Sequence, residues 1–219
     1  MKRTEIKGVL THAGKFCHCF DQISLCAVAE NEVKAVLSAH KNLRSTEIPC
    51  ETVNIGATST AYNYQNLEGV TEVRSGVYGF FDLVMMGVGV CRVNDIAASV
   101  ITTVIGHNQE KGWLIIDAGW MALSSDRGTA NQPTDCGYGL LTDSNGVLLD
   151  NLQVTNVNQE HGIIEAVNGA SINFSDIPIG SRLHILPNHA CATASMHKQY
   201  HVFDTQDNTY EVWMRIQGW

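Results

Sequence analysis

The spacing of apolar residues predicts a strand, a long helix and a second strand in the first third of the chain. Ile6 to Thr11 and Glu51 to Ile55 are short apolar runs typical of buried strands. Between them, Ser24 to Asn42 carries apolar residues at helical spacing, and Glu32 is among the polar residues expected on the solvated side. This order predicts a βαβ unit, which normally belongs to a parallel sheet with helices outside.

The pattern changes near Arg74-Ser75-Gly76. Beyond this point strand-like runs follow one another with turn signals between them, which predicts an all-β domain. The expected strands are Tyr78 to Gly87, Ala98 to Ile105, Gly112 to Ile116, Leu148 to Asn156, Ile163 to Val167, Arg182 to Leu186, His201 to Asp204 and Thr209 to Ile216. We therefore expect an α/β part over residues 1–76 and a β-domain over residues 77–219.

The predicted α/β part is too small to close a parallel sheet. Two strands and one helix leave an unpaired sheet edge and an uncovered apolar helix face. The pattern alone therefore predicts that the front of an α/β domain lies outside this sequence.

The chain is poor in charged residues. They make up 16% of its 219 residues, against about 25% in typical soluble proteins. This low share indicates that a partner subunit, or another part of the same protein, covers much of the surface. The formal net charge of -8 argues against nucleic acid or an anionic membrane as a partner.

Three features predict a cytoplasmic protein. No apolar run is long enough to span a bilayer, and the first residues lead into no signal-peptide core. The seven cysteines are odd in number and lack the spacing of a disulfide framework, which fits reduced thiols.

The strongest candidate for chemistry is His189-Ala190-Cys191, which follows Pro187-Asn188. In an extended strand alternate side chains point to the same face, so this spacing aims an imidazole and a thiol at one point. These are the two ligand types that zinc prefers. The alternative from these residues alone is a buried cysteine beside a partly buried histidine.

A second candidate is Gly56-Ala57-Thr58-Ser59-Thr60, which begins where the second expected strand ends. Small residues let the backbone approach a ligand closely, and the N–H groups with the three hydroxyls suit a phosphate. An ordinary helix N-cap explains the same residues. Tyr78 offers a phenol near the expected domain boundary and is otherwise a half-buried strand aromatic.

Several short motifs, taken in order, resemble one family. They are Thr11-His12-Ala13-Gly14, Val53-Asn54-Ile55-Gly56-Ala57-Thr58-Ser59-Thr60, Arg74-Ser75-Gly76-Val77-Tyr78-Gly79-Phe80-Phe81-Asp82, Ile116-Asp117-Ala118-Gly119, Ser124-Ser125-Asp126-Arg127-Gly128, Glu160-His161-Gly162, Pro187-Asn188-His189-Ala190-Cys191 and Gly218-Trp219. Nearly end to end, the set resembles the metal-dependent D-serine dehydratase / D-threonine aldolase family, fold-type III pyridoxal-phosphate enzymes related to alanine racemase.

The resemblance implies the C-terminal part of an alanine-racemase-like α/β (TIM-type) barrel followed by a β-domain. It implies that Gly56 to Thr60 hold the phosphate of pyridoxal 5'-phosphate, with Tyr78 nearby, and that His189 and Cys191 bind Zn2+. It also implies a homodimer for the full-length protein. In this family D-serine dehydratases carry H-x-C and D-threonine aldolases tend to carry H-x-D. Because thiolate favours zinc, the expected activity is that of a lyase that converts D-serine to pyruvate and ammonia.

One departure from the family concerns its Schiff-base lysine, which lies near the N-terminus of a longer chain. The lysines here occur in no matching motif: Lys2, Lys7, Lys15, Lys34, Lys41, Lys111 and Lys198. The catalytic lysine is therefore expected to be absent from this chain. Three hypotheses stay open: a D-serine dehydratase or part of one, an aldolase acting on 3-hydroxy-D-amino acids, and a catalytically inactive truncated form.

Overall fold

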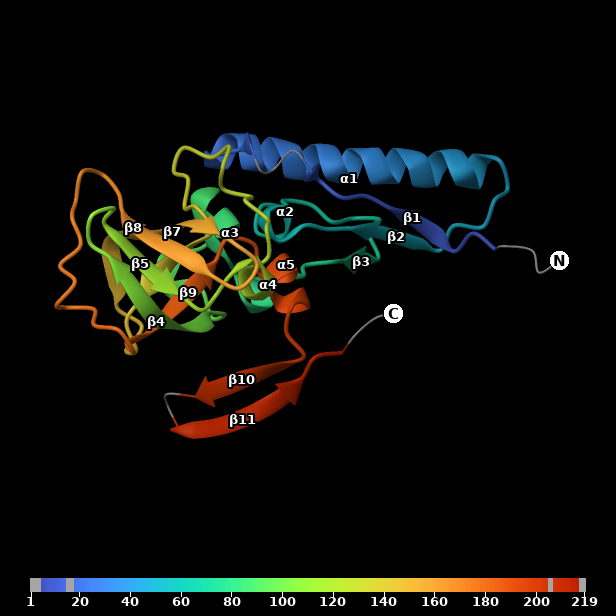
Figure 1. Cartoon of the computed structure of the whole chain (residues 1–219). Helices are drawn as coiled ribbons and strands as arrows, with labels where there is room; N and C mark the ends of the chain where they lie inside the picture. Colours follow the sequence, from blue (N-terminus) through green and yellow to red (C-terminus); the bar gives the residue numbers. More distant parts are fainter. Residues whose placement is uncertain (1–4, 15–17, 205–206, 217–219) are drawn as a thin grey trace. The chain divides into compact units, whose positions relative to one another are not determined.

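The computed structural model describes residues 5–14, 18–204 and 207–216; Gly218-Trp219 of the family motifs lies outside them. The chain forms two compact units, whose elements are labelled in Figure 1. The first unit contains the residues up to Ala97 together with Asn131–Asp135. The second contains Ala98–Ala130 and the residues from Cys136 onward.

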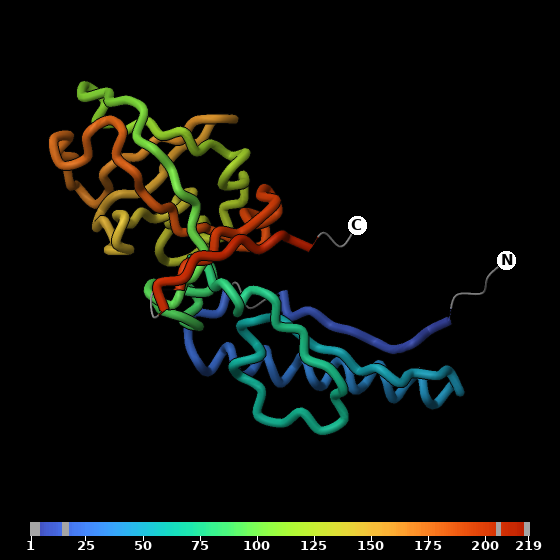
Figure 2. Tube along the Cα trace, turned by 90° about the horizontal axis from the view of Figure 1, so that it is seen from below, coloured from blue at the N-terminus to red at the C-terminus, as the bar shows by residue number. Residues whose placement is uncertain are grey.

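The first unit contains the expected βαβ arrangement. β1 (Gly8–Leu10), β2 (Thr52–Ile55) and β3 (Glu72–Val73) form a parallel sheet in that order. α1 (Gln22–Ser45) connects β1 to β2 and runs alongside the strands in both Figure 1 and Figure 2. The two strands and the helix expected from the sequence are therefore confirmed.

α1 covers one face of this sheet. It begins after Asp21, whose carboxylate accepts a hydrogen bond from the Ser24 N–H at 2.9 Å and caps the helix. Val36 of α1 packs with Val53 and Ile55 of β2. The buried side chains of α1 are Leu25, Ala29, Glu32 and Val36. The expectation that Glu32 faces solvent is therefore wrong.

The segment expected to be a strand over Tyr78 to Gly87 is helical instead. It contains η2 (Val77–Gly79), a 3-10 turn, and α3 (Leu83–Gly87). The Asp82 carboxylate caps α3 by accepting a hydrogen bond from the Met85 N–H at 2.9 Å. The successive side chains Leu83, Val84 and Met85 of α3 are all buried, as in a buried strand, so the apolar pattern alone does not distinguish a helix from a strand here. α3 packs on the α/β part, and the first compact unit extends to Ala97 rather than residue 76.

The second unit is built on a closed antiparallel β-barrel with the strand order β4-β5-β8-β7-β6-β9. Its strands are β4 (Val100–Asn108), β5 (Trp113–Ile116), β6 (Gly139–Thr142), β7 (Leu148–Val157), β8 (Gly162–Ala166) and β9 (Arg182–Pro187). Only β6 was not expected from the sequence, because its four residues follow a glycine-containing loop and are too few to show an alternating pattern.

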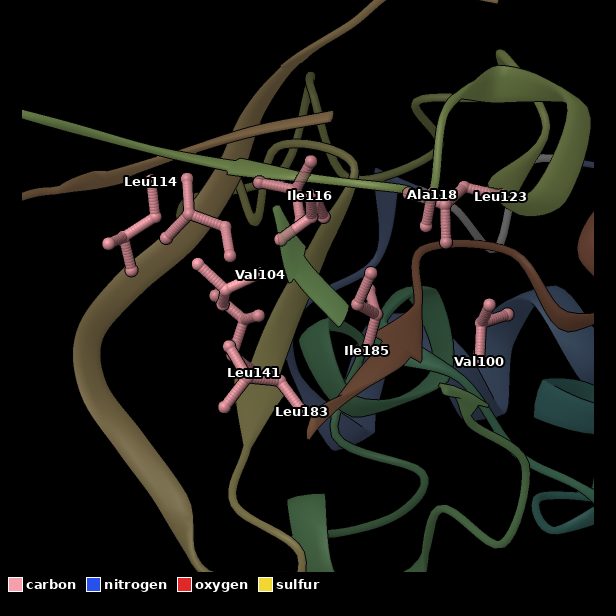
Figure 3. Packing of buried hydrophobic residues seen from close by; sticks show 11 residues of the cluster. Val100, Val104, Leu114, Ile116, Ala118, Leu123, Leu141, Leu183 and Ile185 are labelled. Atoms are coloured by element: carbon pink, nitrogen blue, oxygen red, sulfur yellow. The ribbon is translucent and has the colours of Figure 1, made fainter. Parts of the chain in front are cut away.

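Aliphatic side chains from the barrel strands fill the core of the second unit. Figure 3 shows Val104, Leu114 and Ile185 among them, and each is fully buried. The second unit also contains two short helices: α4 (Trp120–Leu123), between β5 and β6 in the sequence, and α5 (Ala190–Ser195), between β9 and β10. The candidate metal ligands lie at the start of α5, in the same unit as this core.

The chain ends in a separate two-stranded antiparallel hairpin, β10 (Gln199–Asp204) and β11 (Thr209–Met214), as the sequence predicts. Within the part of the chain that the structure describes, no helix combines the length and the apolar character needed to cross a membrane.

Candidate functional site

The candidate phosphate-binding residues form the turn directly after β2 and the short helix α2 (Thr58–Ala61). A Cβ built on Gly56 would lie 2.1 Å from the carbonyl oxygen of Arg74, so close backbone packing already requires glycine there. Ala57 precedes α2 in an extended conformation. We call Gly56 to Thr60 the β2 turn.

Hydrogen bonds join the β2 turn to residue 78. The Thr58 hydroxyl oxygen accepts hydrogen bonds from the backbone N–H groups of Val77 at 3.0 Å and Tyr78 at 3.2 Å. The Tyr78 side chain is 56% exposed and lies on a 3-10 turn rather than on a strand. The structure therefore places the backbone of Tyr78 next to the β2 turn, and the exposed side chain makes none of these hydrogen bonds.

The polar groups of the β2 turn fit a phosphate. The Ser59 side chain is fully buried, and its hydroxyl has no hydrogen-bond partner among the described residues. The N–H groups of Thr58, Ser59 and Thr60 likewise have no acceptor within the described part of the chain. A group of donors without acceptors matches a phosphate, whose oxygens only accept. Buried donors without acceptors are unfavourable, and a bound anion would supply the missing acceptors.

A buried carboxylate that the sequence pattern missed holds the β2 turn against α1. Glu32 is only 6% exposed, and its Oε1 accepts hydrogen bonds from the Gly56 N–H at 3.1 Å and the Thr11 hydroxyl at 3.0 Å. Its Oε2 accepts from the Tyr64 hydroxyl at 2.6 Å. Burial and this hydrogen bond hold the pKa of Tyr64 well above its usual value. Thr60 Oγ1 lies 2.9 Å from the Tyr64 hydroxyl, which extends the network into α2.

The candidate metal ligands lie at the start of α5, not on an extended strand. β9 ends at Pro187, and His189 is the last extended residue before the helix, with φ -135° and ψ 107°. Cys191 is the second residue of α5, and its thiol is exposed. The strand expected over Arg182 to Leu186 is confirmed as β9, but the extended conformation expected for the pair His189 and Cys191 is wrong. The buried Thr193 attaches α5 to the end of α4, because its hydroxyl donates a hydrogen bond to the Leu123 carbonyl at 2.8 Å.

Asn188 anchors the backbone immediately before His189. Its side chain is 3% exposed, and its Nδ2 donates to the Thr129 hydroxyl at 2.8 Å and to the Gly137 carbonyl at 2.7 Å. Its Oδ1 accepts from the Thr129 N–H at 3.1 Å. These bonds tie the start of α5 to the loop between α4 and β6.

Asp126 from the same loop faces His189. Its Oδ2 lies 2.6 Å from His189 Nδ1, and the two side chains are 42% and 38% exposed. An imidazole and a thiol suit zinc, so the donor set fits the implied metal. Among the described residues no group of three or more His, Cys, Asp or Glu side chains is arranged to hold a metal ion. Further ligands would have to be water or substrate oxygen.

Comparisons with known sequences add to this picture. Residues 97–203 match the family model of a putative serine dehydratase domain. Over 97% of its length the chain is 48% identical to D-threo-3-hydroxyaspartate dehydratase of Delftia sp.. Over 98% of its length it is 29% identical to D-serine dehydratase of Dictyostelium discoideum. The chain spans 56% and 55% of these two relatives, about half of their length.

Solved structures include one of these relatives and a further protein. The Delftia enzyme matches with a TM-score of 0.90 and 47% identity over 97% of this chain and 56% of that one. An alanine racemase-like protein from Idiomarina loihiensis gives a TM-score of 0.90 and 47% identity over the same shares. Two further structures are variants of a D-threo-3-hydroxyaspartate dehydratase in which a histidine and a cysteine, two positions apart, are each replaced by alanine; the cysteine variant is in the metal-free form.

The parallel βαβ sheet and the β-barrel define the class of protein: the C-terminal portion of an alanine-racemase-like α/β barrel followed by a β-domain. Within that class the chain is related, nearly from end to end, to the C-terminal part of the D-serine dehydratase family. The resemblance expected from the ordered motifs is thereby confirmed.

Proposed function

We propose that this chain is the metal-binding part of a pyridoxal-phosphate- and zinc-dependent dehydratase that acts on a β-hydroxy-D-amino acid. The observation that carries the proposal is the pair His189 and Cys191, held at the start of α5 with Asp126 on the far side of the imidazole. The similarity to two dehydratases supports it. So does the two-residue spacing of the histidine and cysteine replaced in the D-threo-3-hydroxyaspartate dehydratase variants, which is the spacing found here.

Each candidate residue has a defined task in this proposal. Imidazole nitrogen and thiolate sulfur of His189 and Cys191 hold the metal, and donors of the β2 turn hold the cofactor phosphate. When bound, pyridoxal phosphate supplies an electron sink for the carbanion at Cα, and the metal supplies a Lewis acid for the departing hydroxyl. Glu32 keeps the β2 turn in place, and Tyr78 lies beside it. The Schiff-base lysine is not assigned to any lysine of this chain.

D-Serine is the first substrate to test, with pyruvate and ammonia as products. A second candidate is D-threo-3-hydroxyaspartate, because the enzyme that dehydrates it shares 48% identity with this chain. Loss of water from that substrate, followed by hydrolysis that takes up one water and releases ammonia, yields oxaloacetate. The alternative reaction is retro-aldol cleavage of a 3-hydroxy-D-amino acid, which yields glycine and an aldehyde and so differs in its products.

The test measures bound zinc and product release from the purified chain supplied with pyridoxal phosphate and Zn2+. We expect zinc in the wild type and its loss in His189→Ala and Cys191→Ala, whereas Cys26→Ala, a cysteine of the first unit, keeps it. Turnover that disappears in Cys191→Ala would mean that the chain holds a complete site. Zinc content that is the same in all four proteins would contradict the metal site. The homodimer and the cytoplasmic location remain predictions.

A further inference from the structure

The contact between Asp126 and His189 involves a residue that is not itself a candidate metal ligand. The Asp126 carboxylate oxygen Oδ2 lies 2.6 Å from Nδ1 of His189, a short hydrogen-bond distance. A neutral imidazole carries its proton on one nitrogen and a lone pair on the other, and an ionised carboxylate only accepts. The contact therefore requires the proton of His189 on Nδ1 and leaves the lone pair on Nε2.

The loop that carries Asp126 is held in a demanding conformation. Ser124, at the end of α4, has φ 70° and ψ 166°, a backbone region that residues with a Cβ rarely adopt. Ser124 is 4% exposed, and its hydroxyl oxygen accepts a hydrogen bond from the Asp126 N–H at 3.2 Å. The surrounding packing thus fixes the backbone direction from which the carboxylate leaves the loop.

The imidazole is held from its own side as well. Asn188, next to His189 in the sequence, is buried and bonded to Thr129 and Gly137 of the loop that also contains Asp126. Each partner of the contact therefore adjoins a residue that is buried and hydrogen-bonded, Ser124 for Asp126 and Asn188 for His189. Two side chains that meet by chance on a surface have no such support, and pairs of that kind contribute little.

We propose that Asp126 is a positioning residue for the metal site: it fixes the Nδ1–H form and the ring orientation of His189, so that Nε2 is the nitrogen that binds the metal. The proposal rests on the metal binding proposed for His189 and Cys191. A carboxylate behind a metal-binding histidine typically raises the basicity of the ligand, and its removal weakens metal binding by roughly 10- to 100-fold.

The first measurement needs no metal. In the full chain labelled with 15N-histidine, at about pH 8 where an ordinary imidazole is neutral, long-range 1H–15N correlation spectra report which ring nitrogen of His189 carries the proton. We expect the Nδ1–H form in the wild type and a mixture containing the Nε2–H form in Asp126→Ala. Asp126→Asn is expected to keep the Nδ1–H form, because its amide oxygen still accepts. Asp150→Asn, on an exposed stretch of β7, is the control for removal of a carboxylate.

The second measurement is the zinc affinity of the same proteins, by competition with a chromophoric chelator. We expect the dissociation constant to rise roughly 10- to 100-fold in Asp126→Ala, less in Asp126→Asn, and not at all in Asp150→Asn. Wild-type affinity in Asp126→Ala would overturn the positioning role and leave the metal site standing. A wild type that shows the Nδ1–H form but binds no zinc would overturn the metal site and the positioning role with it. A wild type in the Nε2–H form would overturn the positioning role alone.

Discussion

At the scale of single residues, the buried carboxylate of Glu32 accepts hydrogen bonds from several segments of the first unit. Three donors from three segments, Thr11, Gly56 and Tyr64, meet on its two oxygens. A buried donor that loses its acceptor destabilises a protein by about 1–3 kcal/mol. Glu32 is therefore the side chain on which the geometry of the β2 turn depends most.

We predict that Glu32→Ala lowers the free energy of unfolding by at least about 2 kcal/mol, because Gly56 and Tyr64 lose their shared acceptor. Urea denaturation of the purified chain measures this. Glu30→Ala is the matched control on the same helix, since Glu30 forms an exposed pair with Lys34 and such pairs contribute about 0–1 kcal/mol. Equal effects of the two substitutions would show that the network contributes nothing beyond a surface charge.

Asp117, which follows β5, makes a pH-dependent contribution to stability. Partial burial acts to raise the pKa of its carboxyl, but hydrogen bonds from the Thr103 N–H at 2.7 Å and the Thr102 hydroxyl at 2.8 Å outweigh burial, and the pKa is lowered from 3.8. A pKa lowered by folding means that the stabilisation is complete above the unfolded value and is lost as pH falls through the folded value.

We therefore predict that Asp117→Asn lowers the midpoint of thermal unfolding near neutral pH, and that the difference from the wild type shrinks as pH falls below about 4. Differential scanning calorimetry across this range checks the sign. A difference that is constant over the whole range would mean that the ionised carboxylate gives no stabilisation.

Residue roles were harder to predict from the sequence than residue positions. Gly56 was expected to make room for a ligand, whereas the neighbouring Arg74 backbone already requires a glycine there. Glu32 was placed on the solvated side by its charge alone. Its spacing of three and four residues from Ala29 and Val36 would have placed it on the buried stripe of α1. The prediction followed the charge of Glu32 rather than its helical spacing, whereas in the fold three hydrogen bonds allow the charged side chain to be buried.

At the scale of elements, regular segments with local signals were predictable and short ones were not. α1 and β2 follow from their apolar spacing, whereas the helix α3 resembles a buried strand in sequence because three successive apolar side chains, Leu83, Val84 and Met85, are buried. The pair His189 and Cys191 was predicted on a strand, and the structure places it across the start of α5. The buried Asn188 that sets this junction is bonded to residues about 50 to 60 positions away, which no local pattern reports.

The hairpin β10–β11 is the element with the least packing. Every residue of β11 is exposed, and the large apolar side chains Phe203, Trp213 and Met214 are each more than half exposed. An isolated two-stranded hairpin is marginally stable in water. We predict that the amides of β10 and β11 exchange with deuterium much faster than those of β7 and β8 in the closed barrel, as followed by NMR or mass spectrometry. Equal protection would show that the hairpin is covered in solution.

At the scale of the whole molecule, the two units differ in how their sheets end. The barrel closes on itself, so none of its six strands leaves an edge. In the first unit, β1 and β3 pair only with β2 among the described strands, which leaves two open parallel edges. The fold class was predictable from the change of pattern along the chain, and the family was predictable from the order of its motifs. The closure of the barrel was not, because it depends on the pairing of β4 with β9, which are far apart in sequence.

This difference predicts two unfolding transitions. All four tryptophans of the chain lie beyond Ala97, so their fluorescence reports on the second unit, and the ellipticity of α1 reports on the first. We expect the far-ultraviolet circular dichroism signal to fall at a lower urea concentration than the tryptophan emission shifts. Coincident curves would instead indicate one cooperative unit.

The left-handed backbone of Ser124 has a consequence for how such a chain changes under selection. Glycine adopts φ 70° and ψ 166° without a clashing Cβ, so Ser124→Gly removes a local penalty of about 1–3 kcal/mol. It also removes the hydroxyl that holds the Asp126 backbone at 3.2 Å. Selection for thermal stability alone would therefore favour glycine at this position. The same substitution would leave the Asp126 carboxylate less well fixed toward His189. At position 124 we therefore expect substitutions that raise thermal stability to lower metal affinity.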